Sequence, residues 1–211
     1  NRYQASEIFQ RNSNHWIGVP LLACDYDFIP KDDDEKVDFL SKSVYWYTFN
    51  SEKPPFSNKK MRQGLSLAIN REEIAALFNT QPAVSPLPAR HSCVKLSTFS
   101  QFNPQQAKAL FDEALEELSL SKEDFPSLSI IYLAGNVRKK LAEMVKKSWE
   151  EIFNIRCTIE SLEWDNLFTR ITEGDYQVGG IAWHPRVNDP MYTLDAFRDP
   201  INFSKWGNAK Y

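Results

Sequence analysis

From residue 103 onward, the sequence alternates between segments of helical periodicity and segments typical of strands. Asn103 and Pro104 form a common helix start, and apolar residues follow at helical spacing as far as Leu118. The same pattern predicts strands over 128–133, 155–162 and 176–183, and further helices over 137–153, 164–171 and 189–197. This alternation predicts an α/β fold in which helices flank a mixed or largely parallel sheet.

The first half of the chain carries fewer signals. Residues 44–50 are rich in aromatic and β-branched side chains, which predicts another strand. A helix is expected over 58–69, and Asn70 with Glu73 forms a capping box that predicts the start of the next helix. The prolines within 81–89 indicate an extended connector.

The charge balance bears on the partners of the protein. The chain has 211 residues, with 25 Lys+Arg against 28 Asp+Glu and a formal net charge of −3. Nucleic-acid-binding domains usually carry a basic excess, so we expect no nucleic-acid partner. No stretch approaches the ~20 consecutive apolar residues that cross a bilayer. The sequence opens at Asn1 without a secretory leader, so we expect any signal peptide to have been removed or to lie outside it.

The sequence has no G-x-S-x-G, P-loop, H-E-x-x-H or glycine-rich dinucleotide motif, and so it gives no direct sign of catalysis. His91 and Cys93 could form a base and a nucleophile, but no third group that would orient them is in view. His184 and Asp189 are too few for a metal site or an acid–base pair. The three cysteines are far apart, and we expect them to be small buried hydrophobic residues. We therefore predict no enzymatic activity, no cofactor and no bound metal.

The strongest candidate for a binding site is the end of the predicted strand 176–183. This strand ends in Trp183, and the Asn-Asp-Pro segment 188–190 follows, with Asp189 placed to cap the next helix. Ligands of α/β proteins usually bind beyond the carboxyl ends of the strands. Residues 179–180 are both glycine, which indicates a bulge or a close backbone approach within this strand.

Several of these segments resemble the solute-binding proteins of oligopeptide and dipeptide ABC transporters, extracellular solute-binding family 5. Residues 45–50 and 54–71 are similar to that family's aromatic strand, its Pro-Pro-Phe turn and the helix that follows. Residues 103–118 resemble a later helix of the family, although the glycine usual in it is absent. The remaining matches, within a resemblance that runs from about Val37 to Tyr211, are Glu163-Trp164, Gly174-Asp175-Tyr176, Ala182-Trp183, Asn188-Asp189-Pro190 and 205–211.

The resemblance implies a two-lobed architecture of which this chain holds one lobe. Residues 37–211 are expected to form an α/β, ligand-contacting lobe like those of periplasmic binding proteins. Residues 1–36 are expected to form a leading segment from the inter-lobe region. The implied partners are an oligopeptide, the missing second lobe of the same protein and the membrane permease of an ABC transporter. The implied location is the periplasm or the cell envelope, after export.

The resemblance also implies how a ligand is held. An extended peptide would pair its backbone with the strand at residues 181–184, and wide pockets would receive its side chains. The residues placed at the ligand are Ala182, Trp183, His184, Arg186, Asn188, Asp189, Trp164 and Phe168.

Arg186 departs from the family's pattern, because tight oligopeptide binders have an aspartate there that pairs with the ligand's amino group. An arginine repels an ammonium group and attracts a carboxylate or phosphate. Either the binding register differs, or the ligand's amine is blocked or absent, or Arg186 turns outward. A substituted or acidic ligand is one hypothesis.

Other functions stay open from the sequence. The same scaffold could carry a non-peptide ligand such as a metal chelate or haem, and His184 would then be of interest. A hydrolase that uses Cys93 or His184 is a third hypothesis. A non-catalytic interaction module with an aromatic docking surface is a fourth.

Overall fold

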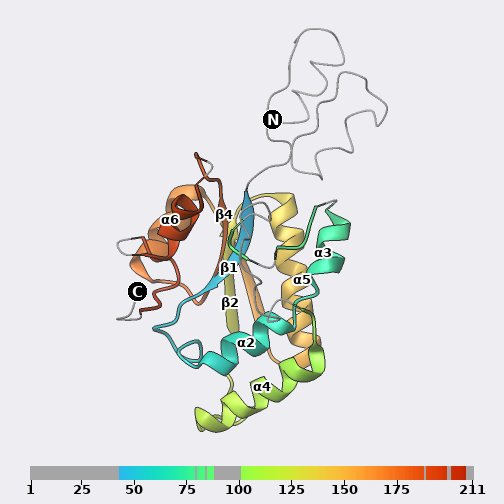
Figure 1. The fold of residues 1–211 in the computed structure, drawn as a ribbon. Coiled ribbons are helices and arrows are strands. Elements are labelled where there is room, and N and C mark those ends of the chain that lie inside the picture. The colour runs from blue at the N-terminus through green and yellow to red at the C-terminus, as the bar shows by residue number, and fades with distance from the viewer. Residues whose placement is uncertain are drawn as a thin grey trace.

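A four-stranded sheet lies at the centre of the protein (Figure 1). The computed structural model describes residues 43–78, 80–83, 85–87, 101–187, 189–198 and 201–207. In their order across the sheet, the strands are β1 (Val44–Phe49), β4 (Val178–Trp183), β2 (Leu128–Leu133) and β3 (Cys157–Leu162). β1 is antiparallel to β4, whereas β2 is parallel to both β4 and β3. The predicted α/β fold with a mixed sheet is confirmed.

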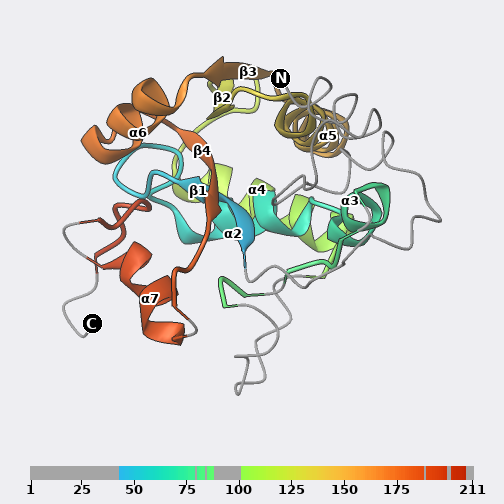
Figure 2. The same ribbon diagram turned by 90° about the horizontal axis from the view of Figure 1, so that it is seen from above.

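Helices cover both faces of the sheet (Figure 2). One face, here called the α5 face, carries α2 (Lys59–Leu67), α3 (Arg71–Leu77), α4 (Pro104–Glu117) and α5 (Asn136–Phe153). The opposite face, here called the α6 face, carries α6 (Trp164–Glu173), α7 (Pro190–Leu194) and the 3₁₀ turn Asp195–Phe197. Two hydrophobic cores result, one on each side of the sheet.

Side-chain caps fix the helix starts where the sequence places them. The side-chain oxygens of Asn58, Asn70 and Asn103 each accept a hydrogen bond of 3.0–3.2 Å from the backbone N–H three residues ahead. Such caps contribute about 1 kcal/mol each. Asp189 caps α7 by accepting a 2.8 Å hydrogen bond from the N–H of Met191. The predicted helix 189–197 is shorter than expected, because α7 ends at Leu194 and a 3₁₀ turn completes it.

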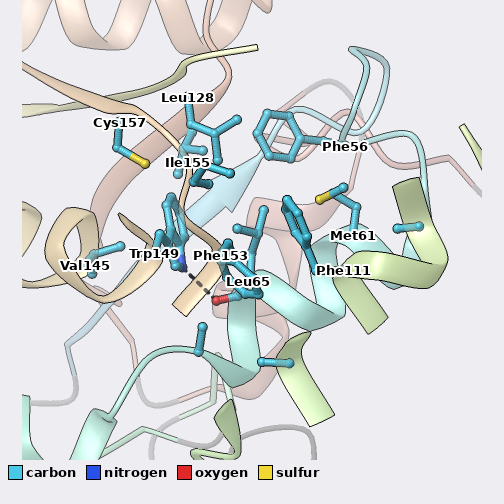
Figure 3. Close-up of a cluster of buried hydrophobic side chains, with 14 of the residues drawn as sticks. Phe56, Met61, Leu65, Phe111, Leu128, Val145, Trp149, Phe153, Ile155 and Cys157 are labelled. Carbon is cyan, nitrogen blue, oxygen red and sulfur yellow. Dashed lines mark hydrogen bonds between the residues drawn. The ribbon is translucent and has the colours of Figure 1, made fainter. Parts of the chain in front are cut away.

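The largest fully buried side chains of the core on the α5 face are aromatic (Figure 3). Phe111 stacks on Phe153 with their ring centroids 4.5 Å apart, and both side chains are buried. The buried indole of Trp149 donates a 2.9 Å hydrogen bond to the carbonyl oxygen of Leu65. That bond satisfies the polar end of the ring and ties α5 to α2.

The core on the α6 face is smaller and lies nearer the end of β4. Its buried members are Ile131, Leu167, Ile171, Tyr176, Ile181, Ala196 and Phe203. The hydroxyl of Tyr176 donates to the carbonyl oxygen of Phe203, which holds the chain after the 3₁₀ turn against the sheet. Residues far apart in the sequence therefore surround the carboxyl end of β4.

The glycine pair in β4 reflects close approach and not a bulge. β4 pairs with β1 in unbroken register from Val178 to Trp183. A Cβ on Gly180 would lie 2.2 Å from the Tyr45 hydroxyl oxygen, and a Cβ on Gly179 would lie 3.0 Å from Cδ1 of Ile171. Side chains from β1 and α6 thus occupy the volume that β4 leaves empty.

The structure tests some, but not all, of the predictions about cysteines, membrane spans and metal ligands. Cys157 is buried, as expected, and burial raises the pKa of its thiol to about 12. Cys24, Cys93 and His91 lie outside the described residues. Within the described residues, no helix is long and apolar enough to cross a membrane, and no group of three potential metal ligands gathers.

Candidate ligand-binding site

Among the described residues, the carboxyl half of β4 has a strand neighbour along one edge only. Its ladder with β1 continues to Trp183, but its ladder with β2 ends at the pair Tyr132–Gly180. Residues 181–183 therefore have no strand partner on the side of β2 among the described residues. We call this edge of residues 181–183 the free edge.

Ala182 directs its main-chain groups to the free edge. Asn50 donates a 3.0 Å backbone hydrogen bond to the carbonyl oxygen of Gln177, so Gln177 faces β1. Main-chain groups of successive strand residues alternate between the two neighbouring strands. Residues 179, 181 and 183 consequently face β1, and the N–H and C=O of Ala182 face the other way.

An unbroken row of aromatic rings borders the free edge on the α6 face. Trp183 lies in this row, with its ring centroid 6.0 Å from that of Phe203 and 5.9 Å from that of Tyr192. Phe203 leads to Phe168 at 6.5 Å, and Phe168 stacks on Trp164 at 5.6 Å. Trp183, Phe168 and Trp164, which the sequence analysis placed at the ligand, are thus brought together through Phe203. We call these five rings the aromatic row.

The outer part of the aromatic row is open to solvent. Trp164 is 53% exposed and Phe168 is 45% exposed, although both are large apolar side chains. α6 presents both on one side because Trp164 and Phe168 are four residues apart on the helix. A row of exposed rings beside an unpaired strand edge offers apolar contact area next to main-chain donors and acceptors.

Two indole groups at this end of the sheet keep unused donors. The Nε1 atoms of Trp183 and Trp46 are buried and have no hydrogen-bond partner among the described residues. Trp46 lies on β1 with its ring centroid 6.3 Å from that of Trp183. A buried N–H without a partner costs about 1–3 kcal/mol, so an acceptor supplied at this position would stabilise the arrangement.

The polar residues named from the sequence lie around the same strand end. His184 follows β4 and is exposed, and its Nδ1 lies 2.5 Å from the hydroxyl oxygen of Ser43. Arg186 is exposed in the loop beyond. The Asp189 carboxylate caps α7, as noted above, and Asn188 lies outside the described residues.

Three residues that support the site were missing from the sequence analysis. Phe203 and Tyr192 complete the aromatic row. Phe203 lies in a segment without periodicity, and Tyr192 lies in the predicted helix 189–197, where no signal set it apart from the other apolar residues. The buried Asn50 donates hydrogen bonds to the carbonyl oxygens of Gly174 at 2.9 Å and Tyr176 at 3.2 Å. Asn50 thereby fixes the turn that leads into β4. In the sequence, only its position at the end of the predicted strand 44–50 pointed to a structural role.

The sequence matches a known family over most of its length. Residues 14–205 match the family described as bacterial extracellular solute-binding proteins, family 5 Middle. The chain is 27% identical to the oligopeptide-binding protein OppA of Bacillus subtilis (strain 168), over 96% of this chain and 39% of that protein. It is 24% identical to the probable deoxycholate-binding periplasmic protein YgiS of Escherichia coli (strain K12), over 100% of this chain and 39% of that protein. The chain thus spans about two fifths of the length of these relatives.

The fold also matches solved structures. The crystal structure of the ABC transporter substrate-binding protein CtaP from Listeria monocytogenes superposes with a TM-score of 0.84 at 21% identity, covering 100% of this chain and 44% of that one. Family 5 proteins are non-catalytic components of transport systems, in agreement with the prediction that this chain is not an enzyme. The chain belongs to family 5 of the bacterial extracellular solute-binding proteins.

Proposed function

We propose that this chain is the peptide-contacting lobe of a binding protein that delivers oligopeptides to the permease of an ABC importer. The observation that carries the proposal is the free edge, where β2 stops pairing at Gly180 and β4 continues for three residues. An extended peptide can add itself there as a further strand. Main-chain pairing depends little on side-chain identity, so one edge can accept many sequences.

The aromatic row supports the same proposal. An added strand projects alternate side chains toward each face of the sheet. Side chains that point to the α6 face would meet Trp183, Phe168 and Trp164. Two of these rings are exposed, and burying a ring of this size contributes about 2–3 kcal/mol. The relatives named as peptide-binding proteins agree with this ligand class.

The proposal extends to the whole protein. The chain covers 39% of the Bacillus relative, which agrees with a second lobe that closes over the peptide from the other side. Such a protein would act in the periplasm or at the cell envelope, beside its permease. His184 and Arg186, at the open end of β4, would then face the terminus of the bound peptide.

The first test is direct identification of the ligand. The protein should be purified from its own organism, as the cell produces it, and the material released on denaturation should be analysed by mass spectrometry. A mixture of short peptides is the expected result. Peptide-free protein that also fails to bind a random pentapeptide library in calorimetry would contradict the proposal.

The second test removes one main-chain donor. Ala182→Pro deletes the N–H that faces the free edge and leaves the ladder with β1 intact. Because one hydrogen bond is worth about 0.5–1.5 kcal/mol, peptide affinity should fall by a factor between about 2 and about 13. A peptide N-methylated at its central residue gives the reciprocal perturbation without changing the protein. Unchanged affinity in both experiments would exclude strand addition at this edge.

A non-peptide ligand is the second candidate. It is supported by the exposed aromatic row and by the relative named as probably deoxycholate-binding. A large apolar molecule could lie on Trp164 and Phe168 without using the free edge. In that case Ala182→Pro would leave affinity unchanged, and the mass spectrum would show a single small molecule. A haem or metal-chelate ligand would instead give a visible absorption band.

A further inference from the structure

The two faces of the sheet differ in chemistry at the free edge. The α6 face carries the aromatic row. The α5 face carries the phenols of Tyr45 and Tyr47, which alternate with Trp46 along β1 and meet edge to face at 5.5 Å. Because Ala182 pairs with Tyr45, its side chain points to the α5 face, as Tyr45 does.

The two phenols place polar atoms within the α5 face. Their hydroxyl oxygens are buried and have no hydrogen-bond partner among the described residues. Burial raises the pKa of Tyr45, and the Tyr47 side chain and then the positive charge of nearby Arg138 act in the opposite direction. Tyr45 also lies directly over Gly180, so its hydroxyl sits beside the point where the β2 ladder ends.

Arg138 is a cation in an unusual place. It lies in the first turn of the 18-residue helix α5, whose N-terminal N–H groups receive no side-chain cap from Gly135. A cation at a helix N-terminus is unfavourable unless an anion is also present. Arg138 is half-buried and has no ion-pair partner within the described residues, and its guanidinium donates a long hydrogen bond, 3.5 Å, to the carbonyl oxygen of Ala134. The neighbouring Lys139, by contrast, faces solvent and pairs with Glu143 at 3.9 Å.

These observations point to a common ligand group. Helix N–H groups without a side-chain cap, a guanidinium without an ion-pair partner among the described residues and a buried phenol oxygen without a hydrogen-bond partner there all favour a carboxylate. We propose, on the basis of the peptide-binding function above, that the α5 face of the free edge holds an acidic side chain of the bound peptide. A peptide residue beside Ala182 would project toward Arg138 and Tyr45, and its two neighbours would project toward the aromatic row. Preferred ligands would therefore alternate an acidic residue with aromatic or large apolar residues.

The test compares peptides that differ only in side-chain charge and order. Calorimetry on the intact protein, freed of ligand, would use the C-terminal amides Ala-Phe-Glu-Phe-Ala, Ala-Phe-Gln-Phe-Ala and the reordered Ala-Glu-Phe-Phe-Ala. The amides remove the terminal carboxylate as a competing anion. The alternating Glu peptide should bind about tenfold more tightly than the other two at low salt.

Two protein variants test whether Arg138 is the source of the preference for the Glu peptide. Arg138→Gln should lower the affinity for the Glu peptide to that for the Gln peptide and so abolish the preference. Lys139→Gln makes the same charge change one residue further along α5, and it should retain the preference. Thermal unfolding of both variants checks that they fold, and the three-peptide comparison on the unaltered protein decides the question if one does not.

Several outcomes would overturn the proposal. Equal affinity for the Glu and Gln amides, or a preference that survives Arg138→Gln, would show that no acidic side chain binds there. If only the free-acid form of the Gln peptide gains affinity through Arg138, then this residue holds the terminal carboxylate instead. If the peptides bind with no preference, the proposed peptide-binding function still stands. If none binds, both proposals fail.

Discussion

Replacing Gly180 with alanine tests whether the end of β4 depends on the close cover of Tyr45. The new Cβ would lie 2.2 Å from the Tyr45 hydroxyl oxygen and 3.0 Å from Cε1 of Tyr47. Non-bonded heavy atoms are most stable at about 3.5 Å or more, so the hydroxyl must retreat by about 1.3 Å. Tyr45 has little room for this movement, because its ring already meets Tyr47 edge to face.

Two effects of opposite sign set the size of the change. Overpacking of a filled site costs about 1–3 kcal/mol. Alanine also lowers the conformational entropy of the unfolded chain, which adds about 0.4–1 kcal/mol to the free energy of unfolding. Since the contact is far inside the optimum, overpacking wins, and we expect Gly180→Ala to lower the free energy of unfolding by about 1–2 kcal/mol.

A double-mutant cycle separates the Tyr45 contact from other causes. Tyr45→Phe alone should stabilise the protein by about 1 kcal/mol, because it removes a buried hydroxyl without a partner. In the Tyr45→Phe background, Gly180→Ala should cost about 1 kcal/mol less, although the ring carbons still lie about 3 Å from the new Cβ. Urea unfolding followed by tryptophan fluorescence gives all four free energies.

Gly207→Ala is the matched control, because a Cβ on Gly207 would meet no atom within 4 Å. It should change stability by about 0.5 kcal/mol or less. The reasoning is refuted if Gly180→Ala is as mild as Gly207→Ala. It is also refuted if the effects of Tyr45→Phe and Gly180→Ala are simply additive.

Three further changes test other parts of the structure by urea unfolding. In Gly64→Ala, the new Cβ lies 2.9 Å from the carbonyl oxygen of Ala107, and backbone cannot retreat, so a loss of about 1–3 kcal/mol should exceed the gain of about 1 kcal/mol in helix propensity. Trp149→Phe leaves the Leu65 carbonyl oxygen unpaired and opens a cavity, so it should cost about 2–4 kcal/mol, and a neutral result would contradict the importance of that bond. Burial raises the pKa of both Cys157 and Tyr176 to about 12, above their values of 9.0 and 10.0 in an unfolded chain. The unfolded state therefore loses these protons first, and stability that is complete below about pH 9 should fall by up to about 1.4 kcal/mol per pH unit and group at higher pH. A flat profile from pH 8 to pH 11 would contradict this assignment.

The helices and strands were predictable because each carries a local signal. Asn58, Asn70 and Asn103 cap helices where the sequence places caps, and the apolar stripe that ends at Leu118 packs as α4. The predicted start of the strand 155–162 was wrong by two residues, for a local reason. Asn154 adopts a left-handed conformation with φ of 55°, so the chain turns after α5 and the strand begins only at Cys157.

The arrangement of the site was not predictable in the same way. Trp183, Trp164 and Phe168 were identified through their motifs, but their contact depends on Phe203, which lies 20 residues beyond Trp183 in a segment without periodicity. Strand order is a property of the whole sheet, and no residue of β1 indicates in the sequence that this strand pairs with β4. The glycine pair predicted that another group approaches β4 closely, but the sequence did not indicate that this group is the side chain of Tyr45.

The different neighbours of the two halves of β4 explain why a binding edge can be rigid. Residues 178–180 are held between β1 and β2, with Tyr45 and Ile171 filling the space above and below the glycines. Residues 181–183 continue the same strand and remain paired with β1, so their free groups are fixed before a ligand arrives. A binding edge that is ordered in advance loses less conformational entropy on binding than a flexible loop would. The ability of residues 181–183 to bind a ligand therefore depends on the core that holds residues 178–180. Substitutions at Gly180 should weaken ligand binding by disturbing β4, even though Gly180 itself pairs with β2.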